Sequence, residues 1–414
     1  MSSVLALPYD IVVQIIDNVG ETDDMNLIKE LALVSHSFHQ ICSKHLFATI
    51  DLHDDVPMRQ ASSKKGFVKL LKRRPDVVKY IRKLTYTVEY DGRCDTSPFS
   101  ATYPCSDYDD NLLSPILPNF LRTISFLNCL TITAPKLVNW NTMDSSLTSA
   151  FLRLMRLPTI NHIDLSSIIN FPLSGLTTSE SVNLRRLDIF YLRPEDEDSH
   201  GTVVLSGMMP KIREFHTIES SLLTTKLLRA ETQDGQPVFN LMDLRRLSIS
   251  FGCTFEEEWN LQYLLQNAKL LEKLHLSLAY EGVEGLHDIL SPSAHTLREF
   301  ELTVSLYSIR QPLAELGEEL EAMAGNNILE ALSFEFLATG GEKEDSIGST
   351  FQGVEEVLAK PGWSALRQVS FKVSVAKRAA KLCEALQSLP NKYLSHLSKL
   401  GSVAFNYECN LEQD

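Results

Sequence analysis

The residues with the clearest capacity for chemistry are three histidines and a cysteine near the N-terminus. His36, His39, Cys42 and His45 follow one another at spacings of three. Imidazole and thiolate groups on one helix could hold a metal ion such as zinc. Cys42, however, falls on the predicted packing side of that helix. We therefore favour ordinary surface histidines and expect no metal site.

No segment carries a catalytic signature. The sequence has no GxSxG, GxxxxGK, GxGxxG, HExxH or paired CxxC motif. Because no nucleophile, acid–base pair or ligand set converges, we expect a protein that is not an enzyme and needs no cofactor.

Residues 64–83 form the one strongly basic stretch. A nuclear localisation signal or a patch for an acidic or phosphorylated partner would explain it. Phe67, Leu70 and Leu71 nevertheless give it an apolar face, and Pro75 would end it before the strand at Leu84. We favour a helix packed on the body of the protein with a solvated basic side.

Three short helices are predicted before this stretch. Pro8 suits the first turn of the first helix, Asp23 or Asp24 can cap the second, and Ser35 can cap the third. Apolar residues cover most of the first helix, apart from one narrow polar stripe of Asp10, Gln14 and Asp17. Such a helix should be buried on two sides. Because about forty residues rarely bury enough surface to be stable alone, these helices imply a partner in this chain, in another protein, or in both.

Residues 7–47 resemble an F-box of the form common in fungal proteins. The resemblance is carried by Leu7-Pro8, Ile11, Ile15-Ile16, Leu31-x-x-Val34-Ser35-x-x-Phe38 and His45-Leu46-Phe47. In that family the three-helix unit docks on a Skp-type adaptor and so joins a cullin-based ubiquitin ligase. The resemblance implies that adaptor-binding residues here are Leu7, Pro8, Ile11, Ile15, Leu31, Val34 and Phe38. The alternative is that residues 1–50 are a helical cap for the domain that follows.

From residue 51 to 414 one short pattern recurs, apolar-x-x-apolar-x-apolar, in which the last two positions have strand period. Most copies are about 24 to 37 residues apart, the range of a solenoid unit. The copies begin at Ile81, Leu127, Ile160, Leu184, Ile212, Leu244, Leu271, Leu297, Leu329, Leu366 and Leu400. We predict one long domain whose parallel strands are each joined by a crossover.

Helical patterns fill the gaps between these strands. They are Phe151 to Met155; Trp259 to Leu265, opened by Glu256–Glu258; Pro312 to Met323; and Val375, Ala379, Leu382 and Leu386. Three segments fit the array poorly: an irregular insertion at about 87–120, and the surface loops 194–201 and 340–350. The body is similar to the irregular, ribonuclease-inhibitor-like branch of the leucine-rich-repeat family, which implies an α/β fold curved into a solenoid.

The open face of such a sheet is built from the residues that alternate with the strand core. We predict that a target protein binds there. The candidate residues are His162, Asp164, Arg186, Asp188, Phe190, Glu214, His216, Arg246, Lys273, His275, Glu299 and Glu301, followed by Ser333, Glu335, Gln368 and Lys372, with Ser248 among them. The sign of the charge changes along this row, from basic to acidic and back, which suits a protein partner better than a polyanion.

Composition limits the compartment and the partners. The 414 residues are 44% hydrophobic and 22% charged, with a net charge of −14, which disfavours nucleic acid or anionic membranes as the main partner. No apolar run is long enough to cross a bilayer, and the first twenty residues lack a basic leader. Seven scattered cysteines indicate reduced thiols, and no Asn-x-Ser/Thr sequon occurs. We expect the cytoplasm, the nucleus or both.

Two functions remain open at this point. The first is the substrate-recognition subunit of a cullin-type ubiquitin ligase, with the helices on the adaptor and the solenoid on a target. The second is a leucine-rich-repeat scaffold or inhibitor that binds proteins without assembling a ligase.

Overall fold

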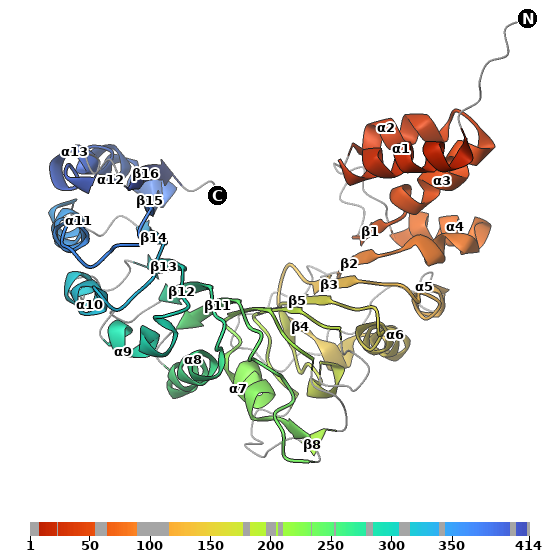
Figure 1. The fold of residues 1–414 in the computed structure, drawn as a ribbon. Coiled ribbons are helices and arrows are strands. Elements are labelled where there is room, and N and C mark those ends of the chain that lie inside the picture. The colour runs from red at the N-terminus through yellow and green to blue at the C-terminus, as the bar shows by residue number, and fades with distance from the viewer. Residues whose placement is uncertain are drawn as a thin grey trace, which may run out of the picture. The chain divides into compact units, whose positions relative to one another are not determined.

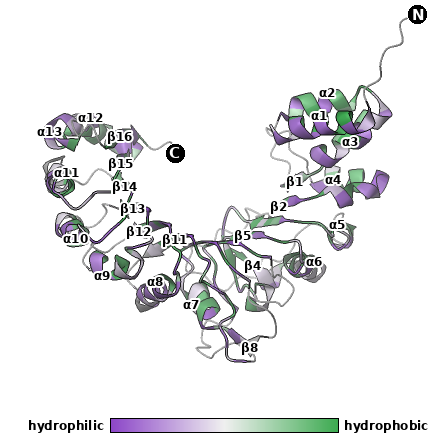
Figure 2. Cartoon of the chain, in the orientation of Figure 1, coloured by the Kyte–Doolittle hydropathy of each residue, from purple (hydrophilic) through white to green (hydrophobic). Residues whose placement is uncertain are grey.

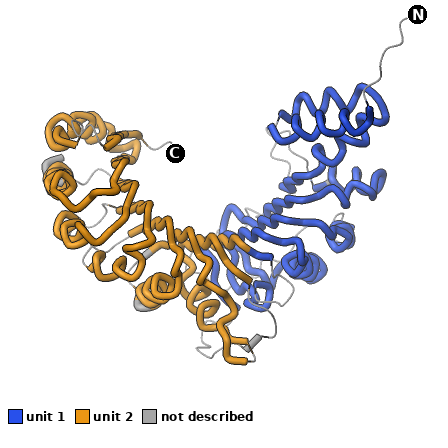
Figure 3. The backbone as a smooth tube through the Cα atoms, in the orientation of Figure 1, with its two compact units in different colours: residues 1–184, 191–199, 205–208 blue, residues 185–190, 200–204, 209–414 orange. Residues whose placement is uncertain are grey.

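The protein is α/β and forms two compact units (Figures 1 and 3). The computed structural model describes residues 8–22, 24–53, 64–88, 116–176, 183–195, 204–205, 210–232, 234–251, 254–278, 285–305, 315–338, 344–397 and 403–411. Unit 1 comprises residues 1–184, 191–199 and 205–208, and unit 2 comprises residues 185–190, 200–204 and 209–414. Outside the described residues lie Leu7, most of the predicted insertion (89–115), residues 196–201 and 340–343, Pro312 and Leu400.

Unit 1 begins with three helices and continues as parallel strands separated by helices. Its strands pair in the order β1-β2-β3-β5. Its main elements are α1 (Tyr9–Glu21), α2 (Met25–Ala32), α3 (His36–Leu46), β1 (Thr49–Leu52), α4 (Lys64–Arg73), β2 (Lys83–Thr87), α5 (Ile116–Leu121), β3 (Cys129–Thr133), α6 (Ser145–Met155) and β5 (His162–Ser166). Its shorter pieces are β4 (Val138–Asn139), which pairs with β6 (Ile168–Ile169), and the 3₁₀ turns Pro75–Tyr80, Trp140–Thr142 and Leu173–Gly175.

Unit 2 repeats the same scheme with longer strands, paired in the order β7-β9-β11-β12-β13-β14-β15-β16. The strands are β7 (Arg186–Phe190), β9 (Glu214–Ile218), β11 (Arg246–Phe251), β12 (Lys273–Leu278), β13 (Glu299–Ser305), β14 (Ala331–Ala338), β15 (Gln368–Val375) and β16 (Ala404–Leu411), with the two-residue strands β8 (Val204–Leu205) and β10 (Glu231–Thr232). The helices are α7 (Ser221–Arg229), α8 (Phe255–Asn267), α9 (Leu286–Leu290), α10 (Leu316–Met323), α11 (Glu344–Leu358), α12 (Ala380–Leu386) and α13 (Leu389–Tyr393), with 3₁₀ turns at Ser291–Ser293 and Lys377–Ala379.

All pairs within these two strand sets are parallel, which confirms the predicted strand direction. The apolar positions of the repeated pattern fall in register across neighbouring strands, as in the row Leu247, Leu274, Phe300, Leu332 and Val369. These side chains are buried, whereas most of the residues between them are partly or fully exposed. Parallel neighbours require a crossover, so the helices cover the apolar face and the other face keeps polar side chains.

An aromatic cluster fills the core of unit 2 near its C-terminal end. The ring of Phe371 lies 5.2 Å from that of Phe334 and 5.0 Å from that of Phe351. Phe405 adds a fourth ring at 6.2 Å from Phe371. Aromatic pairs at such separations contribute beyond their buried area, and they join strands β14, β15 and β16 to helix α11.

Two predicted element boundaries are wrong. Val375 was expected to open a helix, but it is the last residue of β15, because it continues the buried alternation of Val369, Phe371 and Val373. The expected loop 340–350 contains the start of α11 at Glu344, since Ile347 and Phe351 are buried at helical spacing.

The predicted insertion 87–120 also ends earlier than expected. Its final residues belong to α5, in which Leu117, Pro118 and Leu121 are buried, so the helix packs on the sheet despite its proline. The helix from Phe151 to Met155 is confirmed as part of α6. Glu256–Glu258 occupy the first turn of α8, as the sequence indicated, and Thr254 caps this helix.

Replacing Phe371 by alanine tests the aromatic cluster. We expect a loss of about 3–5 kcal/mol in the stability of unit 2, because a large fully buried ring would leave a cavity. Urea unfolding followed by circular dichroism measures the loss, and hydrogen exchange should place it in β14 to β16. The control Phe126→Ala removes a ring that is half exposed and should cost less than about 1 kcal/mol. Equal costs for the two variants would contradict the assignment.

Candidate functional site

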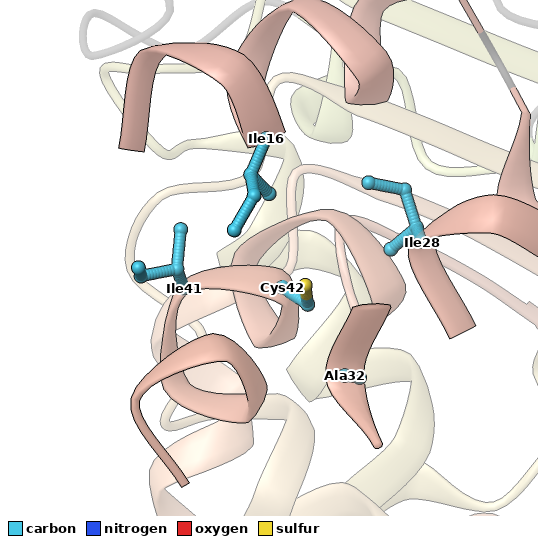
Figure 4. Close-up of a cluster of buried hydrophobic side chains, with 5 residues drawn as sticks. All are labelled: Ile16, Ile28, Ala32, Ile41 and Cys42. Carbon is cyan, nitrogen blue, oxygen red and sulfur yellow. The ribbon is translucent and has the colours of Figure 1, made fainter. Parts of the chain in front are cut away.

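The three N-terminal helices share a small core of their own. Its buried members are Ile16 of α1, Ile28 and Ala32 of α2, and Ile41 and Cys42 of α3, whose side chains are drawn in Figure 4. Six further apolar side chains pack against this cluster and remain partly exposed: Val12, Val13, Val19, Leu31, Phe38 and Leu46.

Capping and one charged group fix the geometry of these helices. The carboxylate of Asp24 accepts a hydrogen bond from the backbone N–H of Leu27 at 3.1 Å, and the Ser35 hydroxyl accepts one from Phe38 at 3.3 Å. Both caps were predicted from the sequence. Because each cap satisfies an otherwise unpaired N–H, α2 and α3 begin at defined residues.

Asp17 ties α1 to the end of α3. Its carboxylate lies 2.6 Å from Lys44 Nζ and 2.8 Å from His45 Nε2. Burial alone would raise the pKa of Asp17, but the hydrogen bonds and positive charge of Lys44 and His45 outweigh that effect and lower it.

The same three helices expose more large apolar side chains than a small cap needs. The side chains of Leu33 and Val34 are 86% and 65% exposed. On α1, Ile15 is 47% exposed although its neighbour Ile16 is 1% exposed. The exposed apolar residues of this unit are Tyr9, Ile11, Ile15, Leu27, Leu33 and Val34, and Figure 2 shows apolar segments on α1 and α2.

The prediction that α1 is buried on two sides is therefore wrong for the isolated chain. Only the side that carries Ile16 is packed, and the side that carries Ile11 and Ile15 faces outward. These two residues are one helical turn apart, so they form a continuous apolar stripe. We name the six exposed residues Tyr9, Ile11, Ile15, Leu27, Leu33 and Val34 the apolar surface of the three-helix unit.

The predicted adaptor-binding residues separate into two groups. Pro8, Ile11, Ile15 and Val34 are exposed. Leu31 and Phe38 instead pack partly against the core of the three helices. Tyr9, Leu27 and Leu33 were not among the predicted adaptor-binding residues, although Leu27 falls at helical spacing with Leu31 and Val34.

The predicted metal candidates on α3 have separate surroundings. His39 Nε2 lies 3.2 Å from Arg74 Nη1, His45 contacts Asp17, and Cys42 is fully buried. No group of three or more potential metal ligands occurs in the described parts of the chain.

The polar strand face of unit 2 is hollowed into a cavity of about 440 Å³. Nine of the predicted face residues line it: Arg186, Glu214, His216, Arg246, Ser248, Lys273, His275, Glu299 and Glu301. Sequence reasoning missed Glu272 and Arg298, which also line it. Both directly precede a strand, Glu272 before β12 and Arg298 before β13. A charged residue just before a predicted strand is the sequence feature that could have identified them.

Ion pairs join the charges that line this cavity. Glu214 accepts from Arg186 Nη1 at 3.4 Å and from Arg246 Nη1 at 3.2 Å. Lys273 Nζ lies 3.0 Å from Glu299. Four basic and four acidic side chains thus line the cavity, so its charge is close to balanced.

Asp188 and Ser248 are less exposed than the sequence predicted, although Ser248 lines the cavity. The Asp188 side chain is 3% exposed and lies 2.9 Å from Arg186 Nε. The longer Arg186 side chain covers the Asp188 carboxylate and pairs with it. Burial of this carboxylate without a partner would be energetically unfavourable. Ser248 is buried beside His275 Nδ1 at 2.9 Å, and Phe190 is half-buried.

His216 is the most unusual group at the cavity. Its Nε2 atom is buried, has no hydrogen-bond partner, and lies 4.0 Å from Asp188 Oδ1. Burial lowers the pKa of His216, although the charge of Asp188 opposes the change. The ring is therefore held neutral at pH 7.

The remaining predicted face residues lie elsewhere. His162 and Asp164 occupy β5 of unit 1, where they contact Cys129 and Thr131. Ser333, Glu335, Gln368 and Lys372 lie on β14 and β15, and Glu335 contacts Lys372.

Comparison with models of known protein families finds no match for this chain, and comparison with curated proteins finds no relative. Within the described residues, no helix combines the length and apolar character that crossing a membrane requires. The arrangement itself therefore carries the functional argument: an outward apolar surface on three helices, and a charge-balanced cavity on a strand face.

Replacing Asp17 by asparagine tests the link between α1 and α3. The folded-state pKa of Asp17 is lowered, so its stabilising effect is present above the unfolded pKa and is lost as pH falls through the folded value. We expect a loss on the order of 1 kcal/mol or less at pH 7. Thermal unfolding should show that the difference from wild type narrows below about pH 4. A difference that is constant from pH 7 to pH 3 would contradict this role.

Proposed function

We propose that the protein is the substrate-recognition subunit of a cullin-type ubiquitin ligase. The single observation that carries the proposal is the apolar surface of the three-helix unit. Six of the thirteen exposed large hydrophobic side chains among the described residues fall between Tyr9 and Val34. Such a concentration marks a binding site more often than a solvated surface.

The apolar surface fits a helical adaptor partner better than a small ligand. Ile11 and Ile15 project from α1, whereas Leu33 and Val34 come from the turn after α2. A protein surface can cover residues from several elements at once, and buried apolar anchors provide most of the binding energy of such interfaces. In this proposal Leu31 and Phe38 lie behind the adaptor-binding surface and hold the helices in place.

The strand arrays would hold the target. Parallel strands in chain order, each joined by a crossover, are compatible with an irregular leucine-rich-repeat solenoid. The cavity of unit 2 would take a segment that carries both signs of charge, because its own lining carries both signs. Binding to both partners would raise the effective concentration of target lysines near the transfer machinery. The function implies a cytoplasmic or nuclear location.

The second candidate is a scaffold or inhibitor that uses the strand face alone. In that case the three helices are a cap, and no adaptor binds to them. Removal of residues 1–47 would then destabilise unit 1, whereas loss of the apolar surface alone would have no binding consequence.

Two exposed residues on α1 provide the test of adaptor binding. Ile11→Asp or Ile15→Asp should reduce recovery of a Skp-type adaptor in pull-downs at least tenfold, because a charge would replace an apolar anchor. Pro8→Ala combined with Ile15→Asp should do the same. The melting temperature should stay close to wild type, since these side chains are exposed.

Two controls separate binding from folding. Ile16→Asp places the same charge in the core and should unfold the three-helix unit by circular dichroism. Leu270→Asp changes an exposed leucine of unit 2 and should leave adaptor recovery unchanged. If Ile15→Asp retains the adaptor fully, the ligase proposal fails and the scaffold candidate stands.

Charge reversal at the cavity tests target binding. Lys273→Glu should lower recovery of copurifying proteins by about tenfold, because it breaks the pair with Glu299 and places like charges together. The matched control is Lys211→Glu, which changes an exposed lysine paired with Asp243 at 3.5 Å and away from the cavity. Both variants should keep the adaptor. Quantitative mass spectrometry of the purified complexes would contradict the cavity's role if the two target profiles were identical.

A further inference from the structure

The polar strand face of unit 1 places a cysteine between two basic side chains. Cys129 is the first residue of β3, and its register partners are Lys83 on β2 and His162 on β5. The distance from Cys129 Sγ to His162 Nδ1 is 3.2 Å. Lys83 is exposed, and Cys129 and His162 are half-buried, so solvent reaches this row of side chains.

The other charged and titratable groups on this face lie in the next rows. Asp51 and Asp164 occupy the row of Thr85 and Thr131, and Asp164 Oδ2 accepts from Thr131 Oγ1 at 3.5 Å. His53 follows β1 on the same face and lies 3.5 Å from Asp51. No carboxylate therefore shares a register row with Cys129 in strands β1, β2, β3 and β5.

This arrangement places a proton acceptor and a cationic residue beside a thiol. The thiolate is the nucleophile in thiol chemistry, and adjacent lysine or protonated histidine stabilises it. A neutral His162 can accept the Cys129 proton at Nδ1, and the resulting N–H then donates to the sulfur. The ammonium of Lys83 on the opposite side adds a second favourable charge.

Three other described cysteines have surroundings that suppress reactivity. Cys42 is fully buried, and burial raises the pKa of its thiol. Burial and the neighbouring Cys383 raise the pKa of Cys409 to about 12. Cys383 is itself buried. Cys129 is thus more exposed than Cys42 and Cys383, and it differs from Cys409 in having an imidazole rather than a second thiol beside it.

We propose that Cys129 is a thiol–disulfide exchange site that reacts with low-molecular-weight disulfides of the glutathione type, with His162 as its general base. The Cys129 proton passes to His162 Nδ1, and the sulfur attacks one sulfur of the disulfide. The new S–S bond forms as the old one breaks, and the departing thiolate takes up a proton. A glutathione carboxylate can pair with Lys83, which favours this disulfide over uncharged ones. The site is independent of the proposed ligase function.

The test uses the reduced full-length protein and oxidised glutathione. Peptide mass spectrometry measures the rate of mixed-disulfide formation at each cysteine at pH 6.5, where an ordinary thiol is only about 1% ionised. Cys129 should react at least about tenfold faster than Cys42, Cys383 and Cys409. Cys129→Ser should remove that modification without changing the melting temperature.

Variants of the two basic neighbours separate chemistry from structure. His162→Gln should slow the reaction of Cys129 about three- to tenfold at pH 6.5. Without the base a smaller fraction of the thiol is ionised, and the higher nucleophilicity of the more basic thiolate offsets only part of that loss. The deficit should disappear at pH 9.5, where solvent ionises the thiol without a base. Lys83→Gln is a surface substitution and should slow the reaction about two- to threefold. If His162→Gln unfolds, this variant provides the test of the basic surroundings of Cys129.

Two results would overturn the proposal. One is a Cys129 rate at pH 6.5 no higher than that of Cys409. The other is a deficit in His162→Gln that is absent at pH 6.5 or persists unchanged at pH 9.5, since either outcome denies His162 the role of base.

Discussion

The constraint on which the rest depends is the crossover between parallel neighbours. Each strand of a unit pairs with the next long strand in the chain, in parallel, so the chain must return over one face before it can pair again. The helices therefore gather on that face, and the apolar residues of every strand point toward them. The opposite face receives whatever residues alternate with the core. Register then stacks these residues into rows, which is how Arg186, Glu214 and Arg246 become neighbours across three strands.

The three-helix unit is packed differently from the strand arrays. Its core needs only five buried residues and a few partly covered ones, and the sequence supplies more apolar side chains than this core accepts. The excess is not scattered. Leu33 and Val34 stand in the turn between α2 and α3, where the described residues leave them exposed. Exposed groups of this size carry a solubility cost, which a binding partner would remove.

The sequence predicted those features that have a period. The strand triplets, the parallel direction, the caps at Asp24 and Ser35, and the face residues that line the cavity all follow from spacing and local chemistry. Boundaries failed where two patterns overlap, as at Val375, which fits both a helix and the end of a strand. The exposure of Asp188 also could not be predicted, because it depends on where the Arg186 side chain lies. Leu33 was missed because an apolar residue in a turn has no periodic partner.

The pairing of charges on the strand face limits what can bind there. A ligand that met isolated arginines would gain from any negative charge, but Arg186 and Arg246 already share Glu214. A polyanion would have to displace Glu214 and would lie against Glu299 and Glu301 as well. Like charges placed together in this way cost several kcal/mol. A partner that carries both signs of charge could instead exchange one ion pair for another, so in the proposed target-binding role the surface would favour such a partner over a polyanion.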